Sequence, residues 1–185
     1  AVLGTTSYGD ILKAIREAME GKHFQEFKDI DYLPEKLGKR VLTTGGHFGY
    51  LKIAEGCDKH CTYCIIPKLR GKFRSAPMER LVTQAKEMAE EGVKELILVA
   101  QETTVYGTDI YGKKSLHILL KELCKIKGIR WIRVLYCYPE EIYDELIQTM
   151  KEEKKICHYL DLPIQHASDR ILKRMGRRTT QAELV

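Results

Sequence analysis

The sequence predicts an α/β fold in which parallel strands alternate with helices and form part of a barrel. Four apolar, strand-like runs are each followed by a helical pattern. The runs recur at intervals of roughly 30 to 45 residues, which leaves room for right-handed helical crossovers between parallel neighbours. Four such units cannot close a barrel, so we expect the carboxyl-terminal part of the fold to be missing. An open, flavodoxin-like sheet is the alternative, but no glycine-rich phosphate-binding fingerprint follows any strand.

The amino-terminal residues are expected to form a smaller, separate unit. A short apolar start precedes an amphipathic helix at residues 10–20. The apolar face of this helix consists of Ile11, Leu12, Ile15, Ala18 and Met19. A strand–helix pair of this size cannot bury that face alone, so residues 1–24 are expected to be the end of an α/β domain whose earlier part is absent. The polar residues 25–46 would be a linker.

The main body is expected to cover residues 47–185. The predicted strands are residues 50–54, 95–100, 130–136 and 159–162. The predicted helices begin near Pro77, Ser115, Glu140 and Ser168. Proline is favoured in the first turn of a helix, and glycine often ends one, as Gly92 and Gly128 do here.

The bulk composition is that of an ordinary globular protein. The 185 residues, 44% hydrophobic and 31% charged, can bury one substantial core. No apolar run is long enough to span a bilayer and no signal peptide opens the chain, which predicts a cytoplasmic protein without membrane contact. The net charge of +5 is mild, but residues 59–74 carry basic side chains and no acid. A second basic run consists of Lys173, Arg174, Arg177 and Arg178. Either run could face an anionic cluster, a carboxylate or ribosomal RNA, or be a solvated surface.

Three cysteines lie close together directly after the first predicted strand. Cys57, Cys61 and Cys64 have C-x3-C-x2-C spacing, and cysteines this close can bind one metal centre. Closed zinc sites and ferredoxin-type clusters use four protein ligands, so a set of three leaves one coordination position open for chemistry. Two alternatives remain: a zinc site completed by His47 or His60, or three buried cysteines that are only hydrophobic.

The loops that follow the four strands are expected to meet at one end of the fold, where ligands bind. These loops are residues 57–64, 101–106, 137–139 and 165–168. They bring together thiols, amides, hydroxyls and aromatic rings. They contain no serine or cysteine nucleophile with an evident base, so no catalytic residue is predicted.

The cysteine spacing resembles that of the radical S-adenosylmethionine (SAM) enzymes, and longer segments resemble one family among them, the radical SAM methylthiotransferases. These segments are YLKIAEGC at 50–57, IPKLRGKFRS at 66–75, QETT at 101–104, YG at 106–107, DLPIQHAS at 161–168 and MGR at 175–177. The resemblance covers essentially the whole chain. It implies a TIM-like radical SAM barrel, here partial, preceded by the tail of the family's α/β amino-terminal domain.

The resemblance also implies an activity. In the family, three cysteines hold a 4Fe-4S cluster whose open iron binds SAM, so Cys57, Cys61 and Cys64 would be the metal ligands. Reductive cleavage of SAM then yields a radical that removes hydrogen from the substrate, sulfur is inserted, and a second SAM supplies the methyl group. The segments are most similar to those of members that modify the β-carbon of an aspartate in the twelfth protein of the small ribosomal subunit. An electron donor such as flavodoxin or ferredoxin would be a further partner.

Parts of the family's architecture are not in this sequence. The family's amino-terminal domain holds a second 4Fe-4S cluster on three further cysteines, which would lie before Ala1. A carboxyl-terminal RNA-binding-like domain is not in the sequence either. We therefore expect that this chain alone cannot carry out methylthiolation.

The resemblance suggests four contacts to SAM besides the cysteines. Tyr63 matches an aromatic residue near the adenine, Gln101 stands where similar barrels bind the amino group, and Gln165 stands where they meet the ribose. Arg178, or alternatively Arg174, would meet the carboxylate. Tyr63 could instead only form a wall of the loop, and Gln101 and Gln165 could instead only hold their own loops in place.

Two other functions remain open. A tRNA adenosine methylthiotransferase shares the same chemistry and the same cluster. A zinc-stabilised RNA-binding module, in which the three cysteines and a histidine are structural, belongs to a different class.

Overall fold

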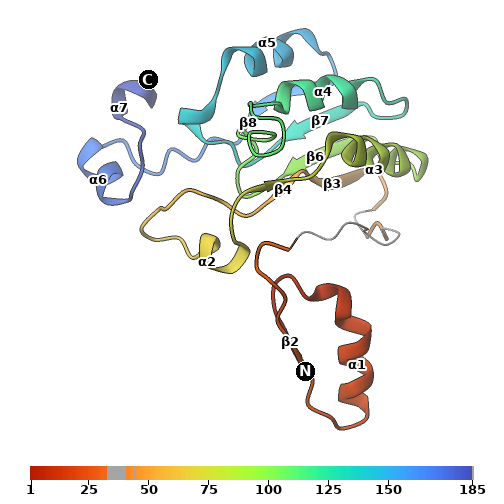
Figure 1. Cartoon of the computed structure of the whole chain (residues 1–185). Coiled ribbons are helices and arrows are strands. Elements are labelled where there is room, and N and C mark those ends of the chain that lie inside the picture. The colour runs from red at the N-terminus through yellow and green to blue at the C-terminus, as the bar shows by residue number, and fades with distance from the viewer. Residues whose placement is uncertain (33–40, 44, 185) are drawn as a thin grey trace.

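The computed structural model describes residues 1–32, 41–43 and 45–184, and it contains a small amino-terminal unit and a larger α/β body (Figure 1). Part of the expected linker, residues 33–40 and 44, lies outside the described residues. None of the described helices has the length and apolar content that crossing a bilayer requires.

Among the described residues, four parallel strands form the central sheet of the body. They are β3 (Phe48–Lys52), β6 (Glu95–Val99), β7 (Trp131–Val134) and β8 (Ile156–Leu160). Their spatial order, β3-β6-β7-β8, follows the chain, and every pairing is parallel. A flavodoxin-like sheet would have neighbours on both sides of its first strand, whereas β3 lies at one edge of the described strands. The predicted parallel α/β fold, part of a barrel, is therefore confirmed.

Three helices cover one face of this sheet, on the same side in Figure 1. They are α3 (Met78–Glu90), α4 (Leu116–Cys124) and α5 (Asp144–Glu152). Leu51, Leu98 and Val134 lie in register across three strands and are almost fully buried. Side chains alternate between the two faces of a strand, and on the other face Tyr50 and Trp131 are about half exposed.

The first predicted strand of the body differs from the observed one. Strand β3 ends at Lys52, and the next residues form β4 (Ala54–Glu55), which pairs antiparallel with β5 (Arg74–Ser75). This short pair closes the long loop that contains the three cysteines. A sequence pattern alone cannot distinguish one apolar strand from two that change partner.

The helix predicted from Glu140 to Met150 is divided in two. Pro139 starts a 3-10 turn, η2 (Pro139–Glu141), and Ile142 and Tyr143 are extended before α5 begins. The remaining elements of the body are short: α2 (Ile66–Arg70), α6 (Asp169–Arg174) and α7 (Gln181–Leu184). The prediction contained α6 but not α2 or α7.

In the described residues, the amino-terminal unit contains two short parallel strands, a 3-10 turn and one α-helix. Its elements are β1 (Val2–Leu3), η1 (Tyr8–Asp10), α1 (Ile11–Met19) and β2 (Gln25–Glu26). The predicted helix is confirmed, and Ala14 is its one buried residue. Leu12 and Met19 are 66% and 83% exposed, so this unit does not bury the apolar face of its helix.

Candidate functional site

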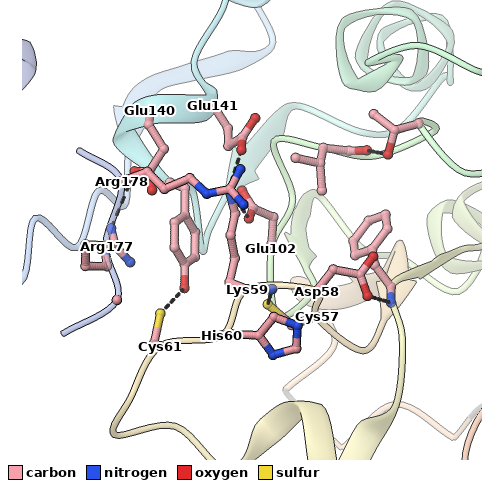
Figure 2. A pocket seen from close by; sticks show the side chains of 15 residues that line it. Cys57, Asp58, Lys59, His60, Cys61, Glu102, Glu140, Glu141, Arg177 and Arg178 are labelled. Atoms are coloured by element: carbon pink, nitrogen blue, oxygen red, sulfur yellow. Dashed lines mark hydrogen bonds and ion pairs between the residues drawn. The ribbon is translucent and has the colours of Figure 1, made fainter. Parts of the chain in front are cut away.

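A cavity of about 340 Å³ lies beyond the carboxyl ends of the parallel strands (Figure 2). Its lining residues come from the cysteine loop, from the segments after β6 and β7, and from the segment after α6. They include Cys57, Lys59, His60, Cys61, Glu102, Tyr138, Glu140, Glu141, Arg177 and Arg178. Three of the four loops that were expected to meet do meet here. The fourth wall is formed by residues 176–178 instead of residues 165–168.

The cysteine loop folds tightly because a glycine precedes it. Gly56 has φ +79, and a Cβ atom there would lie 2.0 Å from the carbonyl oxygen of Lys72. The amide of Cys57 donates to the carbonyl of Gly71 (3.2 Å). Only glycine accepts both the left-handed backbone and this close approach, so the returning chain can pass directly beside Cys57.

The other end of the loop is attached to the segment after α6. The amide of Thr62 donates to the carbonyl of Met175 (3.0 Å), and its hydroxyl donates to the carbonyl of Arg174 (3.1 Å). A Cβ atom at Gly176 would lie 2.9 Å from the carbonyl oxygen of His60. These contacts bring Arg177 and Arg178 to the cavity although they are distant from the cysteines in sequence.

Two of the three cysteines line the cavity. Cys57 and Cys61 are buried, whereas Cys64 is exposed and lies outside the lining residues. The Cys57 sulfur accepts a hydrogen bond from the amide of Lys59 (3.4 Å), and burial raises the pKa of the Cys57 thiol. Across residues 1–32, 41–43 and 45–184, no three histidine, cysteine or acidic side chains stand together as a preformed metal group. The structure therefore does not assemble the three thiols, nor a zinc set with His60.

A network of charges crosses the cavity. The ammonium of Lys59 forms ion pairs with Glu141 and with Oε2 of Glu102 (3.8 Å), and Lys114 pairs with Glu141 (2.9 Å). Burial raises the pKa of Glu102 to about 7, against the opposing hydrogen bond from Thr104 and the charge of Lys59. Burial also acts to raise the pKa of Glu141, but the hydrogen bonds from Lys59 and Lys114 outweigh it and hold this pKa below its ordinary value. The site is thus a partly desolvated cavity in which the acids are close to basic groups.

An aromatic ring and two cations form the wall next to Cys61. Nζ of Lys59 lies 5.1 Å and Cζ of Arg177 lies 4.2 Å from the ring centre of Tyr138. The Arg177 side chain is only 1% exposed, lies 3.6 Å from Glu140 and donates to the carbonyl of Pro163 (3.3 Å). The Tyr138 hydroxyl lies 3.6 Å from the Cys61 sulfur. Figure 2 shows this interaction as a dashed line that starts at the sulfur of the labelled Cys61.

The structure separates the site residues that were expected from the sequence into two groups. Cys57, Cys61 and Arg178 line the cavity. Cys64, Tyr63, Gln101 and Gln165 lie outside the lining residues. Tyr63 and Gln165 are exposed, and Gln165 has φ +65. The buried side-chain oxygen of Gln101 has no hydrogen-bond partner in the described part of the chain.

Sequence reasoning overlooked Glu102, Glu140 and Glu141, and it placed Lys59 and Arg177 only in two basic runs without assigning them to this site. Glu102 is adjacent to the expected Gln101, and a shift of one residue at a strand end reverses which side chain enters the site. Glu140 and Glu141 were assigned to a helix, so the sequence did not predict that they belong to the loop after β7, which lines the cavity. Two adjacent acidic residues shortly after a predicted strand were the one feature of the sequence that could have indicated their place in the site.

Comparison with known proteins relates the chain to radical SAM enzymes at the level of family and of sequence. Residues 51–185 match the family described as the Radical SAM superfamily. The chain is 67% identical over 185 residues to the ribosomal protein uS12 methylthiotransferase RimO of Lachnoclostridium phytofermentans, covering 100% of this chain and 42% of that protein. The protein of the same name from Clostridium botulinum strain Eklund 17B is 56% identical over 185 residues, covering 99% of this chain and 41% of that protein. The chain thus spans less than half the length of these relatives.

Solved structures of two radical enzymes have a similar fold. The radical S-adenosylmethionine methyltransferase TsrM from Kitasatospora setae has a TM-score of 0.59 at 16% identity, over 75% of this chain and 27% of that one. The cobalamin-dependent S-adenosylmethionine radical enzyme OxsB has a TM-score of 0.58 at 15% identity, over 72% of this chain and 20% of that one. At this identity the likeness concerns the fold alone.

Proposed function

Because the chain belongs to the Radical SAM superfamily, we propose that it is the radical SAM core of a methylthiotransferase that acts on ribosomal protein uS12. The observation that carries this proposal is the 67% identity, over all 185 residues, to a protein named for that activity. The target is the β-carbon of an aspartate of uS12. The partners are this ribosomal protein, a flavodoxin- or ferredoxin-like electron donor and ribosomal RNA near the basic segment 59–74, and the compartment is the cytoplasm.

We assign a 4Fe-4S cluster to Cys57, Cys61 and Cys64. Two observations support the assignment: Cys57 and Cys61 are buried at the cavity, and the amide of Cys64 donates to the carbonyl of Cys61 (3.0 Å), so that the third thiol belongs to the same turn. Thiolates are the usual protein ligands of such clusters. When bound, the cluster and SAM supply the radical chemistry, and this chain's own residues position SAM and exclude water.

The cavity offers complementary charges to the amino-acid part of SAM. Glu102 is buried and only partly neutralised by Lys59, 3.8 Å away, so its carboxylate is a suitable partner for an ammonium group. Arg178 lines the cavity and forms no ion pair with any described residue, so it remains our candidate for the carboxylate. Glu102 thereby replaces its neighbour Gln101 as the proposed contact of the amino group. Tyr63 and Gln165 are proposed for the adenosine part, outside the cavity.

The first test is anaerobic reconstitution of the chain with iron and sulfide, followed by metal analysis and electron paramagnetic resonance with and without SAM. We expect about four irons and four sulfides per chain, and a spectrum of the reduced cluster that SAM alters. Replacing Cys57, Cys61 or Cys64 with alanine should remove most of the iron. Cys157→Ala is the matched control, because Cys157 is partly buried in β8 and should leave the iron content unchanged.

A folded chain that binds zinc stoichiometrically and does not respond to SAM would contradict the proposal and favour the zinc-stabilised RNA-binding module. Substrate is tested separately, with the full-length protein of which this chain is a part. A mass increase on a uS12 peptide supports the proposed substrate. A methylthio group found on tRNA adenosine, with uS12 unmodified, would favour the tRNA enzyme.

A further inference from the structure

Tyr138 is held beside Cys61 by contacts of its backbone and of its ring. Its amide donates to the hydroxyl of Thr104 (3.3 Å), and Pro139 follows it at the start of η2. The cations of Lys59 and Arg177 both lie close to the ring. Each cation attracts the ring electrostatically, and Arg177 is itself held by Glu140. The phenol oxygen therefore has a defined position, 3.6 Å from the Cys61 sulfur.

The chemistry of the two groups determines the direction of this hydrogen bond. A cysteine that binds iron is a thiolate and carries no proton. A phenol ordinarily loses its proton only at about pH 10, so the hydroxyl keeps its proton at neutral pH. With a metal on Cys61, the phenol is the donor and the sulfur is the acceptor.

The three cysteine sulfurs differ in their hydrogen bonds. Cys57 accepts a backbone amide, that of Lys59, whereas Cys61 faces a side-chain hydroxyl. The Cys64 sulfur accepts no hydrogen bond from the residues that the structure describes. A single substitution can therefore remove the hydroxyl at Cys61 without changing the backbone donor at Cys57.

We propose that Tyr138 is a positioning residue that raises the reduction potential of the cluster by donating a hydrogen bond to the sulfur of Cys61. Reduction adds negative charge, part of which resides on the sulfur ligands. A hydrogen-bond donor stabilises the reduced state more than the oxidised state, because the reduced sulfur is the more negative acceptor. Tyr138 thus makes the cluster easier to reduce. This inference rests on the proposed function, since it requires a cluster on Cys61.

The test is a redox titration of the reconstituted chain, followed by electron paramagnetic resonance, for the unsubstituted protein and for Tyr138→Phe. Phenylalanine keeps the ring next to the two cations and removes only the hydroxyl. We expect an unchanged iron content and a midpoint potential shifted to a more negative value. Tyr136→Phe is the matched control, because the Tyr136 side chain is about half exposed and its hydroxyl has no hydrogen-bond partner within the described ranges. It should leave the potential unchanged.

A second variant keeps the test decisive if Tyr138→Phe binds less iron. Site-specific fluorotyrosine at position 138 makes the phenol more acidic and a stronger donor, so the potential should shift to a more positive value. Equal potentials for all four proteins, or a negative shift with fluorotyrosine, would overturn the role of Tyr138. A folded, unsubstituted chain that takes up no iron–sulfur cluster would instead refute the proposed function.

Discussion

The ammonium of Lys59 lies 3.8 Å from the carboxylate of Glu102, so that the cysteine loop and the end of β6 are connected by an ion pair inside the cavity. Glu102 is 1% exposed, and a carboxylate this deeply buried is ionised at a considerable cost. The pair places an incompletely neutralised acid next to the cysteines. It also makes the stability of the metal-free chain depend on pH.

We predict that the metal-free chain becomes less stable as the pH rises from 5 to 8, and that Glu102→Gln reduces this dependence. The pKa of Glu102 is raised from 4.5 to about 7 by folding. A carboxyl group with a raised pKa contributes its stability below the unfolded pKa and loses it as the pH rises through the folded value. The expected difference between pH 5 and pH 8 is on the order of 2 kcal/mol. Urea unfolding at the two pH values measures it, and equal pH dependence of the two proteins would contradict the prediction.

A second prediction concerns Gly56. Gly56→Ala should destabilise the chain by roughly 3 kcal/mol or more, because the new Cβ atom meets the Lys72 carbonyl in addition to the cost of a positive φ. Gly112→Ala is the control: Gly112 has φ +70, but a Cβ atom there has nothing within 4 Å. It should cost about 1 kcal/mol, the backbone contribution alone. Similar losses in urea unfolding would show that the close approach at Gly56 is unimportant.

Arg177→Met should destabilise the metal-free chain by about 3 kcal/mol. The substitution leaves Glu140, whose side chain is only 14% exposed, without its cation, and removing one partner of a buried ion pair leaves an uncompensated charge. Arg174→Met is the control, since Arg174 is exposed, and it should change the free energy of unfolding by less than about 0.5 kcal/mol. If both variants unfold at the same urea concentration, Arg177 does not stabilise the cavity wall.

The exposed face of α1 supplies the fourth prediction. Leu12→Ala should change the free energy of unfolding by less than about 0.5 kcal/mol, because Leu12 is 66% exposed. Leu98→Ala, in the middle of the sheet and fully buried, should cost about 2–5 kcal/mol. A large effect at Leu12 would mean that α1 packs against another surface in solution, and sedimentation of the two variants would then identify self-association.

The sequence by itself determined the parallel α/β fold, the unburied helix at the amino terminus and the position of the cysteine loop. Each of these follows from a short-range pattern. Strand β6 has alternating burial within one apolar run, and Gly92 ends the preceding helix pattern. Cys57, Cys61 and Cys64 belong to one loop after the first strand of the sheet, so the position of that loop in the chain does not depend on how distant segments pack.

Only the tertiary structure decided which side chains enter the cavity. It placed Glu102 instead of Gln101 at the cavity, because β6 ends at Val99, one residue earlier than the pattern indicates. It brought Arg177 to the face of Tyr138 (4.2 Å) through contacts of the segment after α6 with the cysteine loop. It also placed Cys64 outside the cavity that Cys57 and Cys61 line. The physical reason is the same in each case: contacts between distant segments depend on backbone direction at loop ends, which local patterns of hydrophobicity and charge do not encode.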